Sequence, residues 1–450
     1  MGLGEKSIFP HDQASLVTMF QWAKARIEDG PDPRNGALTH AELTARLGQT
    51  VTDQGLGWAE AFRLFEGIIA PSTRPFNHPT SLAFVAAAPS PAALGFDAVL
   101  GAAEIFAGNW DGGSGAIYAE NQTIHWLAGL AGFSSTAGGV FVSGGTLGNL
   151  SALHAARVRY QASHEHRPER YRILCSTQAH SSIEAVAKVM DAELVQVSSD
   201  AQGRVVLNDA REKHQQLDGI FAIVANAGAT NSGAVDDIAT LADVAAEKGT
   251  WLHVNGAYGL AALADPVTRP VFNGIERADS FIVDPHKWLF APYDSCALVY
   301  RDAAEGAIAH GQSGAYLDTL DQAAWNPSDF ALHLSRRARG LPLWFSLAVY
   351  GAEAYAQAIR KTCEIAREIA DGIEETGGLD LILGPQLTVI LFNVKDKSAP
   401  ELAAWSEEHR RSGSLLCLPT TWHGETVLRI CVVNPETDPG HVLSALKTAL

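Results

Sequence analysis

The sequence predicts an α/β protein whose largely parallel β-sheet is covered by helices on both faces. Short apolar segments alternate with amphipathic helical patterns through the middle of the chain, such as Ser181–Met190 and Asp237–Lys248, and this alternation is typical of a parallel sheet. The short segments are apolar nearly throughout, as expected for strands that are buried on both sides. The expected strands are Gly139–Ser143, Arg172–Ser176, Glu193–Val197, Gly219–Ala225, Thr250–Val254, Ser280–Val283 and Cys296–Tyr300.

The pattern changes near the C-terminus, where a smaller α/β domain is expected over residues 336–450. Residues 91–335 then form the large domain. Residues 1–90 are expected to be helical and irregular, and too short for a core of their own, so we expect them to pack on another part of the molecule or on a second subunit, with the dimer interface favoured. The elements expected in the small domain are a long helix from about Leu343 to Thr376, strands Leu387–Val394 and Val427–Val433, and a final helix from about Gly440 to Leu450.

Composition limits the classes of partner and compartment. The chain has 450 residues, of which 47% are hydrophobic and 18% charged, and a formal net charge of −17. An acidic surface argues against nucleic acid and anionic membranes as partners. Residues Met1–Pro10 lack the features of a signal peptide, and prolines interrupt the apolar stretch Ser81–Phe96, so no membrane span is expected. The five cysteines are widely spaced and odd in number, which indicates reduced thiols in a cytoplasm and no zinc site.

Four polar segments lie where expected strands end or where the following helices begin. Each has an ordinary structural explanation: a glycine-rich turn, a histidine flanking a helix, an Asn-Gly turn, and a lysine whose ammonium reaches solvent. Because the carboxyl ends of parallel strands meet at one edge of a sheet, the four together indicate a ligand site there. The segments are Val142–Asn149, Ala179–Ser182, Trp251–Gly259 and Asp284–Trp288.

Two of these segments suggest specific chemistry. The glycines before Thr146 let backbone N–H groups approach an anion at a helix N-terminus, although the spacing is neither a Walker P-loop nor a dinucleotide fingerprint. Lys287 follows a buried strand, where desolvation lowers the pKa of a lysine and makes it a usable amine nucleophile.

With these residues in view, the chain resembles the group II pyridoxal-phosphate (PLP)-dependent amino-acid decarboxylases, whose best-known members act on aromatic L-amino acids. The likeness runs from about Asn77 to the C-terminus. Its most specific stretch is Asp284–Trp288, and Arg337–Trp344 is also distinctive. The resemblance implies PLP-dependent transferase fold type I, with a seven-stranded, mostly parallel sheet and a smaller C-terminal domain. It further implies a homodimer with shared active sites.

The resemblance also implies roles for individual residues. Lys287 carries PLP as a Schiff base, and the amino-acid substrate displaces it. Gly145 and Thr146 hold the cofactor phosphate, with His286 close by. His180 stacks on one face of the pyridine ring.

Further implied roles concern the ring, the substrate and the partner subunit. Ala257 packs against the other face of the ring, and Thr230 lies near the ring and the substrate. Tyr316, 29 residues after Lys287, matches a loop tyrosine that protonates the substrate carbanion across the dimer interface. Trp110 and Ser114 match a stretch that lines the neighbouring subunit's pocket, and the segment from Phe84 to Pro91 matches one that lines the side-chain pocket.

One position departs from the family pattern: Asn255 stands where the family has an aspartate that pairs with the pyridine nitrogen. A neutral amide cannot stabilise a buried pyridinium as a carboxylate does. Three interpretations remain open: a decarboxylase slowed by the substitution, a relative with altered carbanion chemistry such as oxidative aldehyde formation, and a PLP-binding protein without significant turnover. Retention of Tyr316 favours the first. The apolar segment from Phe84 to Pro91 suits an aromatic or aliphatic substrate side chain better than a second carboxylate, and an aromatic L-amino acid is favoured.

Overall fold

The structure is a computed structural model that describes residues 8–311 and 325–450. It confirms the predicted α/β class and the seven-stranded sheet, whose strand order is β1-β7-β6-β5-β4-β2-β3. β7 runs antiparallel to both of its neighbours, and the other strand pairs are parallel. The strands are β1 Gly138–Val142, β2 Arg172–Ser176, β3 Glu193–Val197, β4 Ile220–Asn226, β5 Trp251–Asn255, β6 Ser280–Val283 and β7 Cys296–Tyr300.

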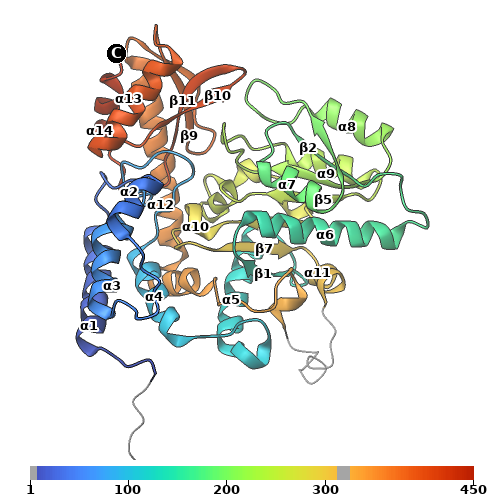
Figure 1. Cartoon of the computed structure of the whole chain (residues 1–450). Coiled ribbons are helices and arrows are strands. Elements are labelled where there is room, and N and C mark those ends of the chain that lie inside the picture. Colours follow the sequence, from blue (N-terminus) through green and yellow to red (C-terminus); the bar gives the residue numbers. More distant parts are fainter. Residues whose placement is uncertain (1–7, 312–324) are drawn as a thin grey trace, which may run out of the picture.

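Both faces of this sheet are buried, as the continuous apolar strands predicted. Successive residues of β1 point into different cores: Phe141 joins one hydrophobic cluster, whereas Val140 and Val142 join another. Helices lie around the sheet (Figure 1), and several of them contribute side chains to these two clusters. They are α5 Trp110–Leu130, α6 Gly145–Ser163, α7 Ser181–Val189, α8 Leu207–Gln216, α9 Ile238–Ala246, α10 Pro285–Trp288 and α11 Ala303–His310, with short helices η3 Gly259–Ala264, η4 Arg269–Phe272, η5 Ile275–Arg277 and η6 Pro327–Asp329.

A second, antiparallel sheet of four strands, in the order β10-β11-β9-β8, lies near the C-terminus. Two of its strands were expected, but both edge strands were missed. β8 is short and only its alternate residues are exposed, and β10 contains Pro419, which weakens a strand prediction and is tolerated at an edge. The elements are α12 Leu341–Glu375, β8 Leu379–Leu383, β9 Val389–Val394, α13 Ala399–Ser412, β10 Leu418–Trp422, β11 Glu425–Cys431 and α14 Pro439–Lys447.

The N-terminal segment forms helices that bury little of their own surface. In α1 only Ser15 is buried, and in α2 no residue is. Figure 1 shows these helices alongside α4 and α12. Their small buried surface agrees with a segment that lacks its own core, although the domain boundaries stay a prediction. The elements of this segment are α1 Gln13–Asp29, α2 His40–Leu47, α3 Trp58–Leu64, η1 Phe65–Ile69 and η2 Ala70–Ser72, and the next helix along the chain is α4 Pro91–Ala103.

The structure bears on the cysteines and on possible membrane spans. The five cysteines are all buried and unpaired. Within residues 8–311 and 325–450, no helix has the length and apolar character needed to cross a bilayer.

Candidate active site

A cavity of about 780 Å³ opens at the carboxyl edge of the large sheet. Segments that follow β1, β4, β5 and β6 line it, together with the first residues of α6 and α7. The cavity therefore lies at the sheet edge that the four polar segments predicted. Every described residue that the sequence assigned to the cofactor lines it: Gly145, Thr146, His180, Thr230, Asn255, Ala257, His286 and Lys287. Tyr316 lies outside the described residues, and the roles of all these residues stay predictions.

The N-terminus of α6 lies at one side of the cavity, in the position from which a helix start can bind an anion. Its N-cap, Gly144, makes no side-chain hydrogen bond to the first turn, so the first backbone N–H groups have no such cap and are available to a ligand. A Cβ at Gly145 would lie 3.2 Å from both the Asp284 carboxylate and the Ile282 side chain. Because Gly145 has no side chain, the start of α6 can lie this close to Ile282 and Asp284.

Lys287 lies in the short helix α10, directly after β6. Its Nζ is 3.0 Å from Oδ2 of Asp284, a carboxylate whose side chain is only 3% exposed. The other oxygen, Oδ1, has no hydrogen-bond partner among the described residues. Next to the lysine, His286 Nδ1 lies 2.7 Å from the carbonyl oxygen of Ser295. The ion pair holds the Lys287 amine in the cavity. It also places the Asp284 carboxylate where it can accept a proton from the amine or return one.

His180 combines the two roles that the sequence left open. It is the N-cap of α7, where its Nδ1 accepts a hydrogen bond from the backbone N–H of Ser182 at 3.1 Å, and its ring also lines the cavity. Although the residue is open to the cavity, loss of surrounding water lowers its pKa below 6.5, and the Lys287 ammonium lowers it further. The imidazole is therefore held neutral near pH 7.

Asn255 is the last residue of β5 and is 8% exposed. Its Oδ1 accepts a hydrogen bond from the backbone N–H of Ala257 at 3.3 Å. Because a backbone N–H can only donate, the side-chain oxygen must face it, and this leaves the amide Nδ2 for an acceptor in the cavity.

A second asparagine was missed by the sequence reading. Asn226 ends β4, lines the same cavity and pairs in register with Asn255. Its Nδ2 is buried and has no hydrogen-bond partner among the described residues. Its position as a polar residue at the end of an apolar strand was the available signal.

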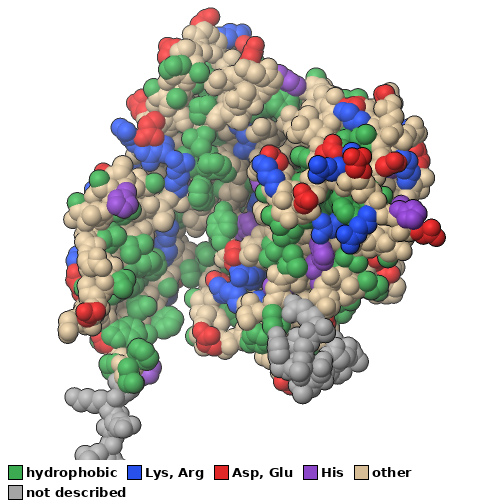
Figure 2. Space-filling model, turned by 45° about the vertical axis from the view of Figure 1, so that its right-hand side comes forward, with side chains coloured by type: hydrophobic (Ala, Val, Ile, Leu, Met, Phe, Trp, Pro, Cys, Tyr) green, Lys and Arg blue, Asp and Glu red, His purple; other side chains and the backbone are tan. Residues whose placement is uncertain are grey.

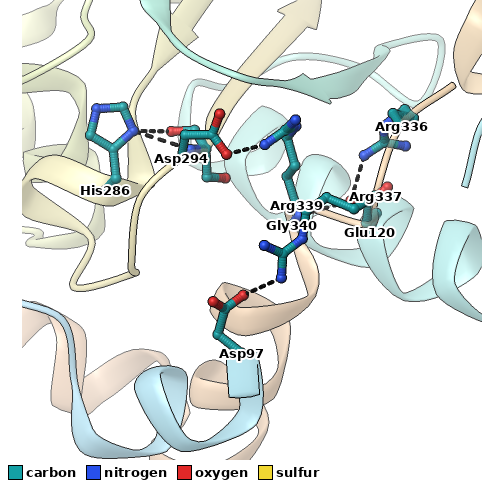
Figure 3. Close-up of polar contacts among 9 residues, drawn as sticks. Asp97, Glu120, His286, Asp294, Arg336, Arg337, Arg339 and Gly340 are labelled. Carbon is teal, nitrogen blue, oxygen red and sulfur yellow. Dashed lines mark hydrogen bonds and ion pairs between the residues drawn. The ribbon is translucent and has the colours of Figure 1, made fainter. Parts of the chain in front are cut away.

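Beside the cavity, the distinctive segment after residue 335 contributes arginines that pair with carboxylates (Figure 3). Arg339 pairs with Asp294, which lines the cavity. Arg336 pairs with Glu120 at 2.7 Å, and both side chains are almost fully buried. Glu120 also accepts the backbone N–H of Gly340 at 2.7 Å. These contacts anchor the start of α12 to α5 and to the cavity wall.

The expectation for the segment from Phe84 to Pro91 is only partly right. Phe84 and Val85 line the cavity, and Phe84 packs edge-on against Phe76. Residues 88–91 instead line a separate cavity of about 680 Å³ beside the N-terminal helices, so that part of the expectation is wrong. The chain turns away because residues 86 and 87 are buried in the protein and α4 begins at Pro91.

Trp110 and Ser114 lie in the first turns of α5 and do not line the 780 Å³ cavity of their own chain. The backbone N–H of Trp110 donates to Asn326 Oδ1 at 3.0 Å. Their expected role in a neighbouring subunit's pocket stays a prediction.

Comparison with known proteins places this geometry in context. A sequence model described as the pyridoxal-dependent decarboxylase conserved domain matches residues 41–395. An aromatic-L-amino-acid decarboxylase from Bacillus atrophaeus is 28% identical, with 90% of this chain and 87% of the relative covered. An L-2,4-diaminobutyrate decarboxylase from Acinetobacter baumannii is 26% identical, with 80% and 76% covered.

Solved structures agree on the fold. The crystal structure of Oryza sativa TDC with PLP and tryptamine superimposes with a TM-score of 0.90 at 21% identity, covering 98% of each chain. That of Catharanthus roseus tryptophan decarboxylase in complex with L-tryptophan has a TM-score of 0.85 at 21% identity, covering 97% of this chain and 96% of that one.

Proposed function

Because the chain belongs to the pyridoxal-dependent decarboxylase family, and so is a carboxy-lyase with PLP as its cofactor, we propose that it converts an aromatic L-amino acid to the amine and CO₂. The observation that carries the proposal is the arrangement of Lys287 in the cavity. Its amine is paired with Asp284 at 3.0 Å, and the cavity it enters also contains the N-terminus of α6.

The described residues fit PLP. The first turn of α6 begins at a glycine with no side-chain cap and offers backbone N–H groups to a phosphate. The cavity, about 780 Å³, lies within the range of 300–1,000 Å³ that small-molecule sites typically have. Asp284 lines the cavity, and its buried Oδ1 has no hydrogen-bond partner among the described residues, so a ligand could supply one.

Each of the chain's own groups has a distinct task in this proposal. Lys287 is the amine that holds the cofactor, and Asp284 is the carboxylate that exchanges a proton with it. Gly145 and Thr146 bind the phosphate, and His180 lies against the ring. When bound, PLP supplies the electron sink for the electrons left by CO₂. The chain's contribution is to orient the substrate carboxylate and to exclude water.

Asn255 is proposed to face the ring nitrogen. Its Oδ1 accepts the Ala257 N–H, so with PLP bound the amide Nδ2 would be the atom to donate toward that nitrogen. An amide donor favours the unprotonated nitrogen, whereas the family's carboxylate favours the protonated one. The proposed consequence is a slower decarboxylase with the same substrate contacts.

The lining of the cavity supports an aromatic substrate. Phe84 is 52% exposed in the single chain and stands on the cavity wall beside Val85. The two carboxylates that line the cavity, Asp284 and Asp294, are already paired with Lys287 and Arg339. Both carboxylates among the described lining residues therefore already have a cationic partner in the chain, and the apolar wall at Phe84 and Val85 suits an aromatic side chain better than a second ammonium.

A homodimer in the cytoplasm is part of the proposal. The unpaired buried thiols suit a reducing compartment. Figure 2 shows hydrophobic side chains gathered on the surface around the N-terminal helices. The exposed hydrophobic residues of the N-terminal segment include Phe9 at 87% and Phe20 at 60%, and a partner subunit would cover such side chains. Tyr316 is proposed to reach the partner's cavity as the proton donor to the α-carbon.

A product screen tests the proposal. The purified protein with PLP is incubated with each of the twenty amino acids, and amine, CO₂, ammonia and hydrogen peroxide are measured from the same reaction. Amine and CO₂ in equal amounts from an aromatic amino acid support the proposal. Turnover confined to a diamino or dicarboxylic acid would contradict the substrate class. Aldehyde with ammonia and peroxide would indicate altered carbanion chemistry, and no product would indicate a PLP-binding protein without turnover.

A further inference from the structure

A row of six hydrogen-bonded side chains runs from the amino ends of β5 and β6 through the interior to the cavity. The first five are at most 5% exposed. Consecutive members are separated by 2.8, 2.8, 2.9, 3.0 and 2.9 Å. In order, they are Trp251, Ser280, His253, Asn149, Ser182 and His180.

The direction of every hydrogen bond follows from the cavity end. The backbone N–H of Ser182 donates to His180 Nδ1, so this nitrogen is an acceptor and carries no proton. The Ser182 hydroxyl, 2.9 Å away, must then donate to it as well. Because a hydroxyl has one proton, its oxygen accepts from the Asn149 amide, as the 3.0 Å contact from Nδ2 shows. Oδ1 of Asn149 therefore faces His253 and accepts from its Nε2–H.

The opposite end fixes the same direction independently. The indole N–H of Trp251 can only donate, so the Ser280 hydroxyl oxygen accepts it at 2.8 Å. The Ser280 proton then goes to His253 Nδ1, also at 2.8 Å. His253 is consequently neutral, with its proton on Nε2, which is the form that Asn149 requires. Burial agrees, since it lowers the pKa of His253 to about 3.

We infer that Asn149 and His253 are positioning residues that hold His180 neutral, with its proton on Nε2 and its Nδ1 closed to protonation. The role of this ring in the reaction rests on the proposed function. An imidazolium would need a proton on Nδ1, where two donors from Ser182 already point. A neutral ring can lie against the cofactor without adding a second positive charge beside Lys287.

The row also ties together the elements that shape the site. Asn149 lies four residues after Gly145 on α6, about one helical turn from the phosphate-binding end. His253 lies two residues before Asn255 on β5, so both side chains project from the same face of the sheet. One buried hydrogen-bond row therefore fixes the helix, the strand and the ring of His180 relative to one another.

Other charges near His180 act on the same equilibrium. Lys287 lowers its pKa and Asp284 raises it. Both lie after β6, whereas the row approaches from α6 and β5. A change within the row can therefore be made without altering either charge.

The first test is the protonation state of His180 in the PLP-bound protein. Histidine labelled with ¹⁵N and with ¹³C at Cε1 is incorporated, and the His180 signal is identified by its loss in His180→Gln. We expect the proton on Nε2 and a titration midpoint below the value of about 6.5 for a free imidazole. A proton on Nδ1 would overturn the inference without the need for any further variant.

The second test reverses one link. A carboxylate only accepts, so in Asn149→Asp the Ser182 hydroxyl turns toward residue 149 and its oxygen becomes an acceptor for His180 Nδ1–H. The midpoint of His180 should rise by at least about one unit, a difference of about 1.4 kcal/mol. Asn208→Asp adds the same charge at an exposed position of α8 and should leave the midpoint unchanged. Equal midpoints in the two variants would overturn the inference.

If Asn149→Asp fails to fold, Ser182→Ala replaces it. This variant removes the hydroxyl donor and keeps the backbone donor, so the midpoint should rise by less, and an unchanged midpoint overturns the inference. The acid limb of the kcat profile should move to higher pH with the midpoint, whereas a general structural defect would lower kcat at every pH. The NMR result stands whether or not the substrate proposal does, and the product screen fails or succeeds independently of the row.

Discussion

Replacing Asn255 with aspartate restores the carboxylate that the family pattern has at this position. The change hardly alters volume, and the new carboxylate can still accept the Ala257 N–H that Asn255 Oδ1 accepts at 3.3 Å. The second oxygen takes the place of the amide Nδ2 and, in the proposed arrangement, presents a negative charge toward the ring nitrogen. We therefore expect Asn255→Asp to fold and to bind PLP.

The size of the effect follows from electrostatics. An opposite charge within about 4–6 Å shifts a pKa by about 1–3 units, and each unit is about 1.4 kcal/mol. Asp284 lies after the neighbouring strand and lines the same cavity, so repulsion between two carboxylates reduces the gain. We expect the low end of the range, a decarboxylation rate at least about tenfold higher.

Two measurements check this prediction. Single-turnover kinetics with the best amino acid give the rate, and the ¹⁵N shift of PLP labelled at its ring nitrogen reports whether that nitrogen is protonated. Asn231→Asp is the matched control, because Asn231 is near the cavity without lining it and its Oδ1 accepts from Thr420 as an aspartate would. Normal PLP binding with neither quantity changed would show that Asn255 does not contact the ring nitrogen. Loss of the native activity while decarboxylation rises would show that Asn255 serves a different reaction.

Four further predictions concern the reaction, the assembly and the stability of the protein. Tyr316→Phe should lower amine and raise aldehyde, ammonia and peroxide, because a carbanion without its proton donor survives long enough to meet oxygen; unchanged product ratios would point to another donor. Mixing Lys287→Ala with Tyr316→Phe should restore activity through mixed dimers, and no recovery despite proven subunit exchange would mean that each subunit is self-sufficient. Glu120→Ala should cost about 3–5 kcal/mol in chemical denaturation because it leaves the buried Arg336 unpaired, and a loss under about 1 kcal/mol would contradict this. The unfolding free energy should fall by up to about 1.4 kcal/mol per pH unit as pH drops from 6.5 toward 3. Over this range His253 binds a proton in the unfolded chain but stays neutral in the folded protein, where its pKa is about 3. An equal slope in His253→Gln would contradict that assignment.

Sequence patterns predicted the large sheet well because its strands are buried on both faces. A segment such as Cys296–Tyr300 is apolar along its whole length and ends abruptly, so its pattern is readily distinguished from that of a helix or a loop. The edge strands of the small sheet lack this signal. Leu379–Leu383 exposes alternate residues and Leu418–Trp422 contains a proline, so the local pattern predicted no strand in either case.

The site was predictable where function places a polar residue at a strand end, as at Lys287 and Asn255. Contacts between distant parts of the chain were not predictable. Nothing local marks Asn149 as the link between His253 and Ser182, because the link exists only when α6, α7 and β5 pack together. The same holds for the ion pair of Lys287 with Asp284, whose partners are three residues apart but meet only because α10 turns at the end of β6.

The amine that holds PLP is the assignment on which the proposed chemistry depends. Borohydride reduction of the PLP-bound protein fixes the cofactor permanently to that amine, and peptide mapping by mass spectrometry then identifies the residue. We predict a single pyridoxyl label on Lys287, and none in the Lys287→Ala variant. A label on any other lysine would contradict the site assignment and the chemistry built on it.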